Sequence, residues 1–372
     1  MDKIVVLDFG SQYSHLICRR IREFSVYAEL VPFDISYEEL QKLNPKGVIF
    51  SGGPSSVYNS DAPVPENKIF EMGLPLLGIC YGHQLIVNKF GGKVKRANKE
   101  YGSSLLTIDS DKDLLSDVGE SVRAWMSHGD EAEEIPPGFK IIGHTEGAKA
   151  AAIASEEKSV YGIQFHPEVV HTEQGTEILK NFVLKVCKAK QDWNMEGFID
   201  TAVEKIAKIE GNVLCGVSGG IDSTVVALLI HKAIGDRLKC VFVNNGLLRL
   251  NEEFEVEDMF KNNFNVNFTS VDASERFLGK LKGIKDPEKK RMIIGEEFVH
   301  VFTEFAEKSG PFKWLAQGTL YPDVIESGVS KGPAAVIKSH HNVGGLPDWL
   351  NLEILEPVRE LYKDEVREIA KI

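Results

Sequence analysis

The sequence predicts an α/β protein of two domains, each built on a largely parallel sheet flanked by helices. Short apolar runs such as Ile4–Leu7, Val48–Phe50 and Val213–Val217 recur, and several precede stretches of helical character. Continuous apolar runs of this length are typical of strands buried on both faces, and their alternation with helices is typical of parallel sheets. The chain of 372 residues also exceeds the roughly 250 to 300 residues at which a single core usually divides.

A polar stretch near the middle of the chain marks the expected domain boundary. The stretch Cys187–Asp192 follows an expected helix, Thr176–Lys185, and a new strand begins after Asn212. Runs near residues 105, 124, 141 and 152 lie closer together than the others and predict hairpins added to the first sheet. We therefore expect a first domain over residues 1–187, a linker over residues 188–195 and a second domain over residues 196–372.

Composition excludes several classes of protein. The chain has 43 Lys and Arg against 55 Asp and Glu, and the net charge of -12 argues against nucleic-acid or anionic-membrane partners. No apolar run approaches the roughly 18 to 20 residues of a membrane helix, and the N-terminal segment does not resemble a secretory signal. Five scattered cysteines without a C-x-x-C pair indicate neither a disulfide framework nor a zinc ribbon. We expect a cytoplasmic protein.

Cys80 is the first candidate catalytic residue. It follows a predicted strand, Leu74–Ile79, lies between Gly78 and Gly82, and precedes a predicted helix, Gln84–Phe90. A strand, a sharp turn and a helix in this order form a nucleophile elbow, and a helix N-terminus favours the thiolate. An isolated cysteine is more often inert core filling, so the interpretation requires partner residues.

His166 is the histidine with the best context for a general base. A predicted strand, Val160–Phe165, leads into His166-Pro167-Glu168. Residues two apart on an extended chain face the same way, so Glu168 can orient His166, and Pro167 keeps His166 extended. The alternative is a surface turn. His83 and His128 are weaker candidates, with pocket lining as the expected role.

Acyl transfer also requires donors for an oxyanion. The turn S-G-G-P over residues 51–54 follows a predicted strand, so the backbone N–H of Gly53 can face the cysteine. The N–H of Tyr81 supplies the second donor. A glycine-rich turn alone is weak evidence, and its weight comes from the combination with the other motifs.

The motifs S-G-G-P, G-I-C-Y-G-H-Q and F-H-P-E, in this order, resemble the class I glutamine amidotransferase domain over residues 1 to about 187. The resemblance implies a flavodoxin-like domain in which Cys80 attacks the side-chain amide of glutamine. His166 then shuttles the proton, Glu168 orients His166, and ammonia leaves. The implied glutamine-binding residues are Gln84, His128 and Asp130.

A second candidate site follows the strand Val213–Val217. Here Ser218, Gly219, Gly220, Ile221, Asp222 and Ser223 precede an apolar helix, Thr224–Ile234. Backbone N–H groups, two hydroxyls and a helix N-terminus make a cradle for phosphate. An aspartate there implies a Mg²⁺ ion between carboxylate and phosphate, although Asp222 can also cap its own helix. The pattern S-G-G-x-D-S resembles the pyrophosphate loop of N-type ATP pyrophosphatases, with an adenine nucleotide alpha hydrolase-like fold.

Three further segments resemble the GMP synthetase (glutamine-hydrolysing) family, and the match extends over the whole chain. They are residues 241–249, 317–327 and 338–347. The resemblance implies that ATP adenylylates xanthosine 5'-monophosphate (XMP), that pyrophosphate leaves, and that ammonia displaces AMP to give GMP. It places Val243 beside adenine, Gly318 near the nucleotide, Asp323 near Mg²⁺ or phosphates and Lys338 on phosphate.

Two departures from the family pattern qualify this interpretation. Asn244 stands where many relatives carry an acid, which weakens a metal role at that position. The family also continues into a C-terminal dimerisation domain, whereas this chain ends at Ile372, so we expect a homodimer for the full-length protein and an incomplete XMP pocket here. Two alternatives stay open: an amidating ligase of NAD synthetase type, and a nucleotide or glutamine sensor without catalysis.

Overall fold

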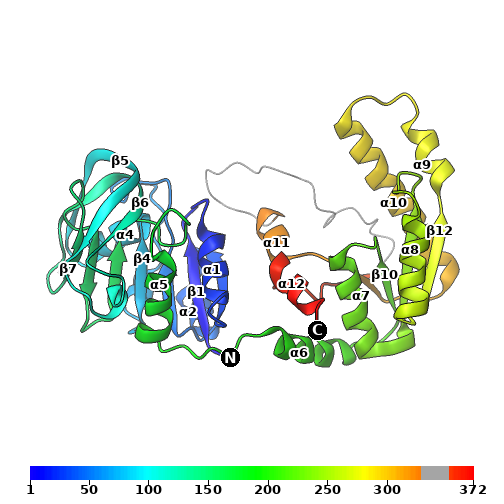
Figure 1. The fold of residues 1–372 in the computed structure, drawn as a ribbon, viewed down its shortest axis with the longest axis horizontal. Helices are drawn as coiled ribbons and strands as arrows, with labels where there is room; N and C mark the ends of the chain where they lie inside the picture. Colours follow the sequence, from blue (N-terminus) through cyan, green and yellow to red (C-terminus); the bar gives the residue numbers. More distant parts are fainter. Residues whose placement is uncertain (328–351) are drawn as a thin grey trace. The chain divides into compact units, whose positions relative to one another are not determined.

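The computed structural model describes residues 1–327 and 352–372. The described residues form two compact units, one running from Met1 to Trp193 and the other beginning at Asn194. The predicted linker, residues 188–195, spans this division. Figure 1 shows both units, and each is described by itself below.

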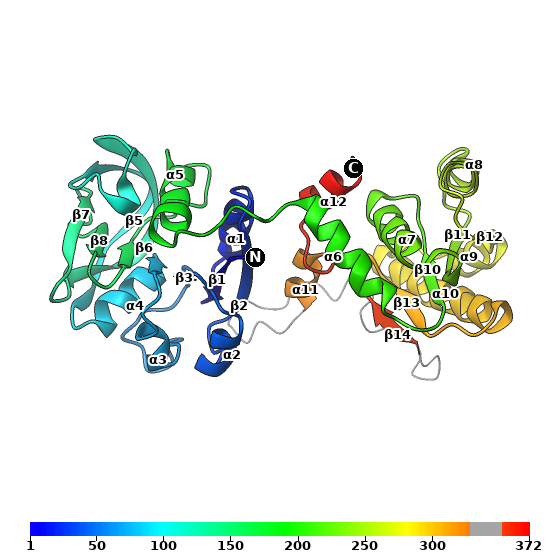
Figure 2. The same ribbon diagram turned by 90° about the horizontal axis from the view of Figure 1, so that it is seen from below.

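The first unit is a sheet with helices on both faces. Its elements are β1 (Lys3–Asp8), α1 (Ser14–Arg22), β2 (Tyr27–Pro32), α2 (Tyr37–Lys42), β3 (Gly47–Phe50), α3 (Asn67–Phe70), β4 (Leu76–Ile79), α4 (Tyr81–Lys89), β5 (Lys93–Ile108), β6 (Ser121–Glu134), β7 (Lys140–His144), β8 (Ala152–Ser155), β9 (Val160–Ile163) and α5 (Gly175–Lys180). A π-helical turn, Asn181–Val186, continues α5. Figure 2 shows α1 and α5 on one face of the sheet and α2, α3 and α4 on the other.

The strand order in this sheet is β2-β1-β3-β4-β9-β8-β7-β5-β6. The strands β2, β1, β3, β4 and β9 are parallel, whereas β8, β7, β5 and β6 join by antiparallel pairing. The prediction of a parallel sheet extended by hairpins is therefore confirmed. All four residues of Ile4–Leu7 are fully buried, as expected for a strand covered on both faces.

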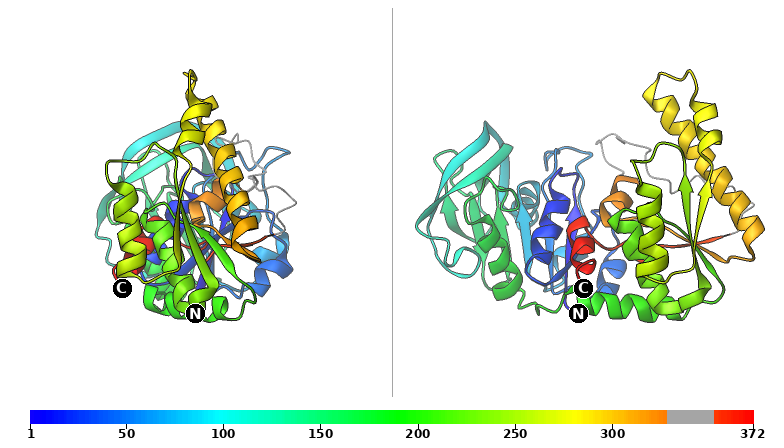
Figure 3. Two further views of the ribbon diagram at one scale, coloured as in Figure 1. Left: turned by 90° about the vertical axis from the view of Figure 1, so that its right-hand side faces the viewer. Right: turned by 45° about the vertical axis from the view of Figure 1, so that its right-hand side comes forward.

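The second unit is a fully parallel sheet with strand order β12-β11-β10-β13-β14. Its elements are α6 (Met195–Ala207), β10 (Val213–Gly216), α7 (Ile221–Ile234), β11 (Leu238–Asn244), α8 (Glu252–Asp258), β12 (Phe268–Asp272), α9 (Ser274–Leu281), α10 (Pro287–Ser309), β13 (Trp314–Ala316), α11 (Tyr321–Ser327), β14 (Glu353–Leu355) and α12 (Lys363–Ile369). Figure 3 shows α7 and α10 on opposite sides of these strands. Within the described ranges, no helix combines the length and apolar character needed to cross a membrane.

The 23-residue helix α10 was not predicted, although its sequence contains the signals for it. The Asp286 side chain accepts a hydrogen bond from the N–H of Lys289 at 2.8 Å, and Pro287 occupies the first turn. Phe298, Phe302 and Phe305 recur at helical spacing, and the last two pack on the sheet in a cluster with Leu214, Val241 and Leu315. Charged residues lie between these positions, so the sequence shows no continuous apolar run that would predict the helix.

We expect Gly82→Ala to destabilise the first unit by about 1–3 kcal/mol, because the new methyl group would overpack a rigid site. A Cβ atom at residue 82 would lie 2.4 Å from the carbonyl oxygen of Phe50 and 2.6 Å from its Cβ. The control is Gly295→Ala on α10, where no atom lies within 4 Å of the added Cβ and a gain of up to about 1 kcal/mol is expected. Urea unfolding followed by circular dichroism measures both, and equal midpoints for the two variants would contradict the close contact.

Candidate active site

The backbone at Cys80 forms a nucleophile elbow. Cys80 has φ 52° and ψ −102°, a conformation that is strained for a residue with a side chain. Its N–H donates to the carbonyl of Ile163 at 2.8 Å, and its own carbonyl accepts from the N–H of Gln84 at 3.2 Å. The helix α4 consequently begins at Tyr81, three residues before the predicted start, and the thiol projects from the turn.

Gly78 and Gly82 are required for close packing rather than for an unusual φ. A Cβ atom at Gly78 would lie 2.4 Å from the carbonyl group of Gly82, and one at Gly82 would meet Phe50. The N–H of Gly82 also donates to the carbonyl of Ser51 at 3.2 Å. The glycines therefore let the first turn of α4 rest directly on β3 and β4.

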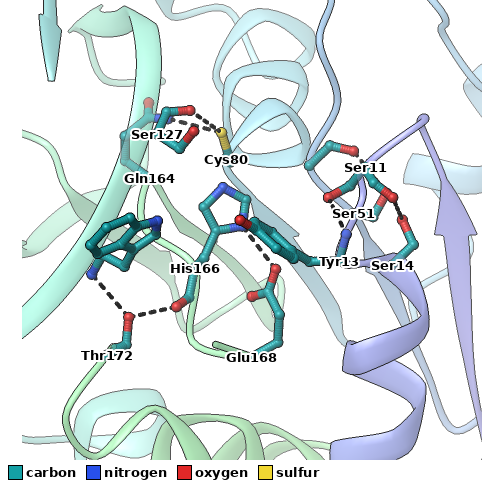
Figure 4. A network of polar contacts seen from close by, with 12 residues as sticks. Ser11, Tyr13, Ser14, Ser51, Cys80, Ser127, Gln164, His166, Glu168 and Thr172 are labelled. Atoms are coloured by element: carbon teal, nitrogen blue, oxygen red, sulfur yellow. Dashed lines mark hydrogen bonds and ion pairs between the residues drawn. The ribbon is translucent and has the colours of Figure 1, made fainter. Parts of the chain in front are cut away.

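His166 and Glu168 lie beside Cys80, as Figure 4 shows. Nδ1 of His166 is 2.8 Å from Oε1 of Glu168, and their side chains are 5% and 0% exposed. A Cβ atom placed on Gly52 would be 3.0 Å from Cε1 of His166 and 3.6 Å from Cβ of Cys80, so the ring and the cysteine share one small space. The Tyr13 ring packs edge-on against His166 with centroids 5.4 Å apart. The structure thus brings the three predicted catalytic residues together.

The environment of His166 favours its positive charge. Burial opposes that charge, but the neighbouring Cys80 and Glu168 outweigh burial and raise the pKa of His166 to about 10. The imidazole is therefore protonated at neutral pH, and a positive charge beside a cysteine favours the thiolate. His83, in contrast, is fully buried, and its pKa falls to about 3 through burial first and the charge of His128 second.

Gln164 is a site residue that the sequence analysis missed. Its Nε2 donates toward Sγ of Cys80 at 3.7 Å, and its side chain is buried. A signal was present, because Gln164 precedes His166 by two positions at the end of a strand and therefore faces the same side.

The expected oxyanion donors lie at the mouth of the elbow. Gly53 and Tyr81 line the same cavity as Cys80. Among the described residues, neither backbone N–H has a hydrogen-bond acceptor. A Cβ atom at Gly53 would lie 2.5 Å from the carbonyl oxygen of Phe9, so only glycine fits there. Two unpaired donors near a nucleophile are what a developing oxyanion requires.

The cavity beside Cys80 has a volume of about 890 Å³ and a largely polar wall. Its lining residues belong to several segments of the first unit: Gly10–Tyr13, Gly53 to Asn59 without Val57, Cys80, Tyr81 and Gln84, Arg96 and Tyr101, Ser127–Asp130, and His166. The expected glutamine-binding residues Gln84, His128 and Asp130 are all part of this wall. His128 does not serve as a second base in this arrangement, because its two ring nitrogens contact the carbonyl of Asp130 and the carboxylate of Glu100.

The second predicted site is a preorganised loop at the N-terminus of α7. Gly219 has φ +74°, and Ser218 Oγ lies 3.2 Å from Ser223 Oγ and accepts from the N–H of Gly220 at 3.3 Å. The helix begins at Ile221, three residues before the predicted start, so Asp222 and Ser223 belong to its first turn. Gly318 lies against this turn, with Cβ of Asp222 3.8 Å from the position of an added Cβ.

The remaining predicted residues of this site differ in their surroundings. Asp222 pairs through Oδ2 with Lys363 of α12, a contact that the sequence analysis missed. Asp323 accepts from the N–H of Leu320 at 2.9 Å, and Val243 is 5% exposed within the core around Phe277. Lys338 lies outside the described residues. No group of three or more metal-binding side chains occurs in the part of the chain that the structure describes.

Asn244, the departure from the family pattern, shapes the turn after β11. Its Oδ1 accepts from the N–H of Gly246 at 2.9 Å, and its Nδ2 donates to Glu253 at 2.6 Å. The amide thus uses both of its polar ends within the protein, whereas an aspartate would repel Glu253.

The elbow, the buried histidine–glutamate pair and the open cavity define a glutamine amidotransferase of the triad class. A family model for class-I glutamine amidotransferase matches residues 5–186, and one for NAD synthase matches residues 193–292. A crystal structure of a glutamine amidotransferase from Thermotoga maritima matches with a TM-score of 0.42 at 16% identity, over 50% of this chain and 98% of that chain.

Similarity to curated proteins extends over the full chain. It is 54% identical to the GMP synthase [glutamine-hydrolyzing] of Brachyspira hyodysenteriae over 373 residues, which cover 100% of this chain and 73% of that protein. It is 55% identical to the protein of the same name from Caldicellulosiruptor saccharolyticus over 371 residues, which cover 99% and 72%. The chain belongs to the glutamine-hydrolysing GMP synthase family.

We expect Glu168→Gln to lower the pKa of His166, because the substitution removes the negative charge that stabilises the imidazolium. The pKa of His166 in the folded protein is about 10, above the ordinary value of about 6.5. The protonated ring therefore contributes its full stabilisation of the fold below about pH 6.5, and this contribution is lost as the pH rises through about 10. The variant should therefore hold less positive charge beside the Cys80 sulfur at neutral pH, and the sulfur should be less reactive.

The rate of Cys80 alkylation by iodoacetamide, measured between pH 6 and 10 by peptide mass spectrometry, tests this expectation. Near pH 7 the Glu168→Gln rate should be at least about tenfold lower than the wild-type rate. The buried Cys18 serves as an internal control for unfolding. Superimposable pH profiles would contradict a role of Glu168 in the ion pair.

Proposed function

We propose that the chain catalyses glutamine-dependent GMP synthesis, with glutamine hydrolysis in the first unit and ATP-dependent activation of XMP in the second. The observation that carries this proposal is the buried contact of Cys80, His166 and Glu168 at the edge of the 890 Å³ cavity. Membership of the GMP synthase family over the full chain supports the assignment of the second reaction.

In the first reaction the Cys80 thiolate attacks the side-chain carbonyl carbon of glutamine. The N–H groups of Gly53 and Tyr81 donate hydrogen bonds to the carbonyl oxygen and stabilise the negative charge that develops on it. His166 gives its proton to the leaving nitrogen, so ammonia departs and a glutamyl thioester stays on Cys80. His166 then removes a proton from water, which hydrolyses the thioester to glutamate.

In the second reaction the loop Ser218–Ser223 binds the pyrophosphate part of ATP. Loop N–H groups, hydroxyls and the start of the 14-residue helix α7 provide donors for phosphate oxygens. Gly318 leaves space beside the first turn for the nucleotide. The oxygen of XMP is adenylylated, pyrophosphate leaves, and ammonia displaces AMP.

The surroundings of Asp222 fit a Mg²⁺ ligand. Its Oδ1 is buried and has no hydrogen-bond partner among the described residues, whereas Oδ2 pairs with Lys363. An unpaired buried carboxylate oxygen is costly without a cation, and oxygen ligands are those that Mg²⁺ prefers. A Mg²⁺ ion held by Asp222, with Asp323 near it, would neutralise phosphate charge as pyrophosphate forms.

We further propose that the protein acts in the cytoplasm as a homodimer. All five cysteines are free and buried, which suits a reducing compartment.

The ammonia must be shielded between the two reactions, because most of it is protonated in water at pH 7. We therefore infer that nucleotide binding in the second unit stimulates glutamine hydrolysis in the first.

Glutamate release from glutamine, with and without Mg-ATP plus XMP, tests the function. Wild type should release glutamate faster with the nucleotides, and Cys80→Ala should lose about 10³-fold or more because no other residue replaces the nucleophile. The variant should still form AMP when ammonium chloride replaces glutamine. Glutamate release that persists in Cys80→Ala would contradict the proposal, and a wild-type rate that ignores the nucleotides would contradict the coupling.

We expect Asp222→Asn to lower XMP-dependent pyrophosphate release strongly and to leave basal glutaminase activity unchanged. The amide cannot supply the negative charge that holds Mg²⁺, so pyrophosphate release should fall by about 10²-fold or more. Asp236→Asn, on an exposed turn of the same unit, is the matched control. If Asp222→Asn releases pyrophosphate at the wild-type rate when Mg²⁺ is limiting, Asp222 is not a Mg²⁺ ligand.

A further inference from the structure

The buried His128 pairs with the partly buried Glu100 beside the glutamine cavity. The His128 side chain is 1% exposed, with Nδ1 3.0 Å from the carbonyl oxygen of Asp130 and Nε2 3.2 Å from Oε2 of Glu100. A carbonyl oxygen only accepts hydrogen bonds, so Nδ1 carries a hydrogen atom. A neutral His128 would then point its Nε2 lone pair at a carboxylate. The geometry therefore requires one more proton, on His128 or on Glu100.

The partners of Glu100 place this proton on His128. Oε1 of Glu100 accepts from Ser104 Oγ at 2.6 Å and faces the hydroxyl of Thr145 at 3.4 Å. Hydrogen bonds donated to a carboxylate stabilise its ionised form. Glu100 is thus an anion with three donors, and His128 is its imidazolium partner.

The other titratable groups around His128 are compatible with this charge. His83 on α4 is kept neutral by burial, so it does not repel the imidazolium. Asp130 on β6 and Arg96, its register partner on β5, carry opposite charges on the neighbouring strands. The protonation state of His128 is therefore determined by Glu100, and no neighbouring cation among these groups opposes it.

Asp130 links the pair to both sides of the glutamine site. Its carbonyl oxygen also accepts from Nε2 of Gln84 at 3.0 Å. The same Nε2 lies 3.4 Å from Oε1 of Gln164, whose own Nε2 points to Sγ of Cys80. The Asp130 carboxylate accepts from Ser56 Oγ at 2.5 Å and Tyr58 OH at 2.7 Å. A continuous set of contacts thus runs from Glu100 to the thiol and to the loop after Gly53.

We propose that Glu100 is a positioning residue for the glutaminase reaction and acts by holding His128 as an imidazolium that orients Asp130. This inference rests on the proposed function. The pair keeps the Asp130 carbonyl and carboxylate in place. The carbonyl holds Gln84 and the carboxylate holds Ser56 and Tyr58, and glutamine binds between these two parts of the cavity wall.

The protonation state of His128 can be observed directly by NMR of the full chain labelled with ¹⁵N-histidine. At neutral pH, wild type should show His128 with both ring nitrogens protonated, assigned by comparison with His128→Gln. Glu100→Gln should show a neutral ring with hydrogen on Nδ1, because the glutamine amide can donate to Nε2. A neutral His128 in wild type would overturn the ion pair.

Steady-state kinetics tests the positioning role. Glu100→Ala should raise the KM for glutamine about tenfold or more, as expected when a hydrogen bond to a charged group is lost, with a much smaller change in kcat. Glu100→Gln should restore part of the affinity, because its amide can still form a hydrogen bond with His128. The matched control is Asp109→Asn, which removes the carboxylate from an exposed histidine pair with His144 in the same unit.

The outcomes separate the two proposals. If wild type is active and both Glu100 variants have the wild-type KM for glutamine, Glu100 has no positioning role. Wild type without glutaminase activity would instead overturn the proposed function, while the NMR measurement would still decide the ion pair. If iodoacetamide alkylates Cys80 in Glu100→Ala at the wild-type rate, the elbow of this variant is folded. If Glu100→Ala loses both alkylation and activity, and Glu100→Gln restores neither, the result counts against the inference.

Discussion

The strained backbone at Cys80 is the constraint on which the first site depends. Its positive φ reverses the chain within one residue, so β4 ends and α4 starts without a connecting loop. A conformation of this kind costs about 1–3 kcal/mol and persists only where the surroundings support it. The support comes from hydrogen bonds to Ile163 and Ser51 and from two glycines that admit close packing. The Tyr81 N–H and the contact with His166 both follow from this turn.

Burial alone does not decide the charge state of the histidines in this site. His83 and His166 are both buried, yet the pKa falls to about 3 in the first and rises to about 10 in the second. The difference is the presence of Cys80 and Glu168 beside His166, whose interactions exceed the cost of burying a charge. Two buried histidines of the first unit thus differ in charge, one neutral in the core and one protonated beside Cys80.

The sequence predicts the parts of the site that depend on local order. A strand, a glycine-flanked turn and a helix identify Cys80, and an alternating strand end identifies His166 with Glu168. The residues that were missed act through contacts between distant segments: Lys363 meets Asp222 across 141 positions, and Gln164 meets Cys80 across 84. No local pattern encodes the Lys363–Asp222 pair, whereas the position of Gln164 two residues before His166 was a local signal for its side of the strand. The early starts of α4 and α7 were missed for a related reason, because each depends on a turn whose geometry is set by neighbouring strands.

Acylation of Cys80 by glutamine is tested most directly by trapping the glutamyl intermediate. Wild type mixed with glutamine and nucleotides, quenched in acid within milliseconds to seconds, can be digested and analysed by mass spectrometry. We expect a glutamyl group on the peptide that contains Cys80, and we expect it to disappear as glutamate accumulates. Turnover of glutamine with no glutamyl adduct at any quench time, or an adduct on another residue, would contradict acylation of Cys80.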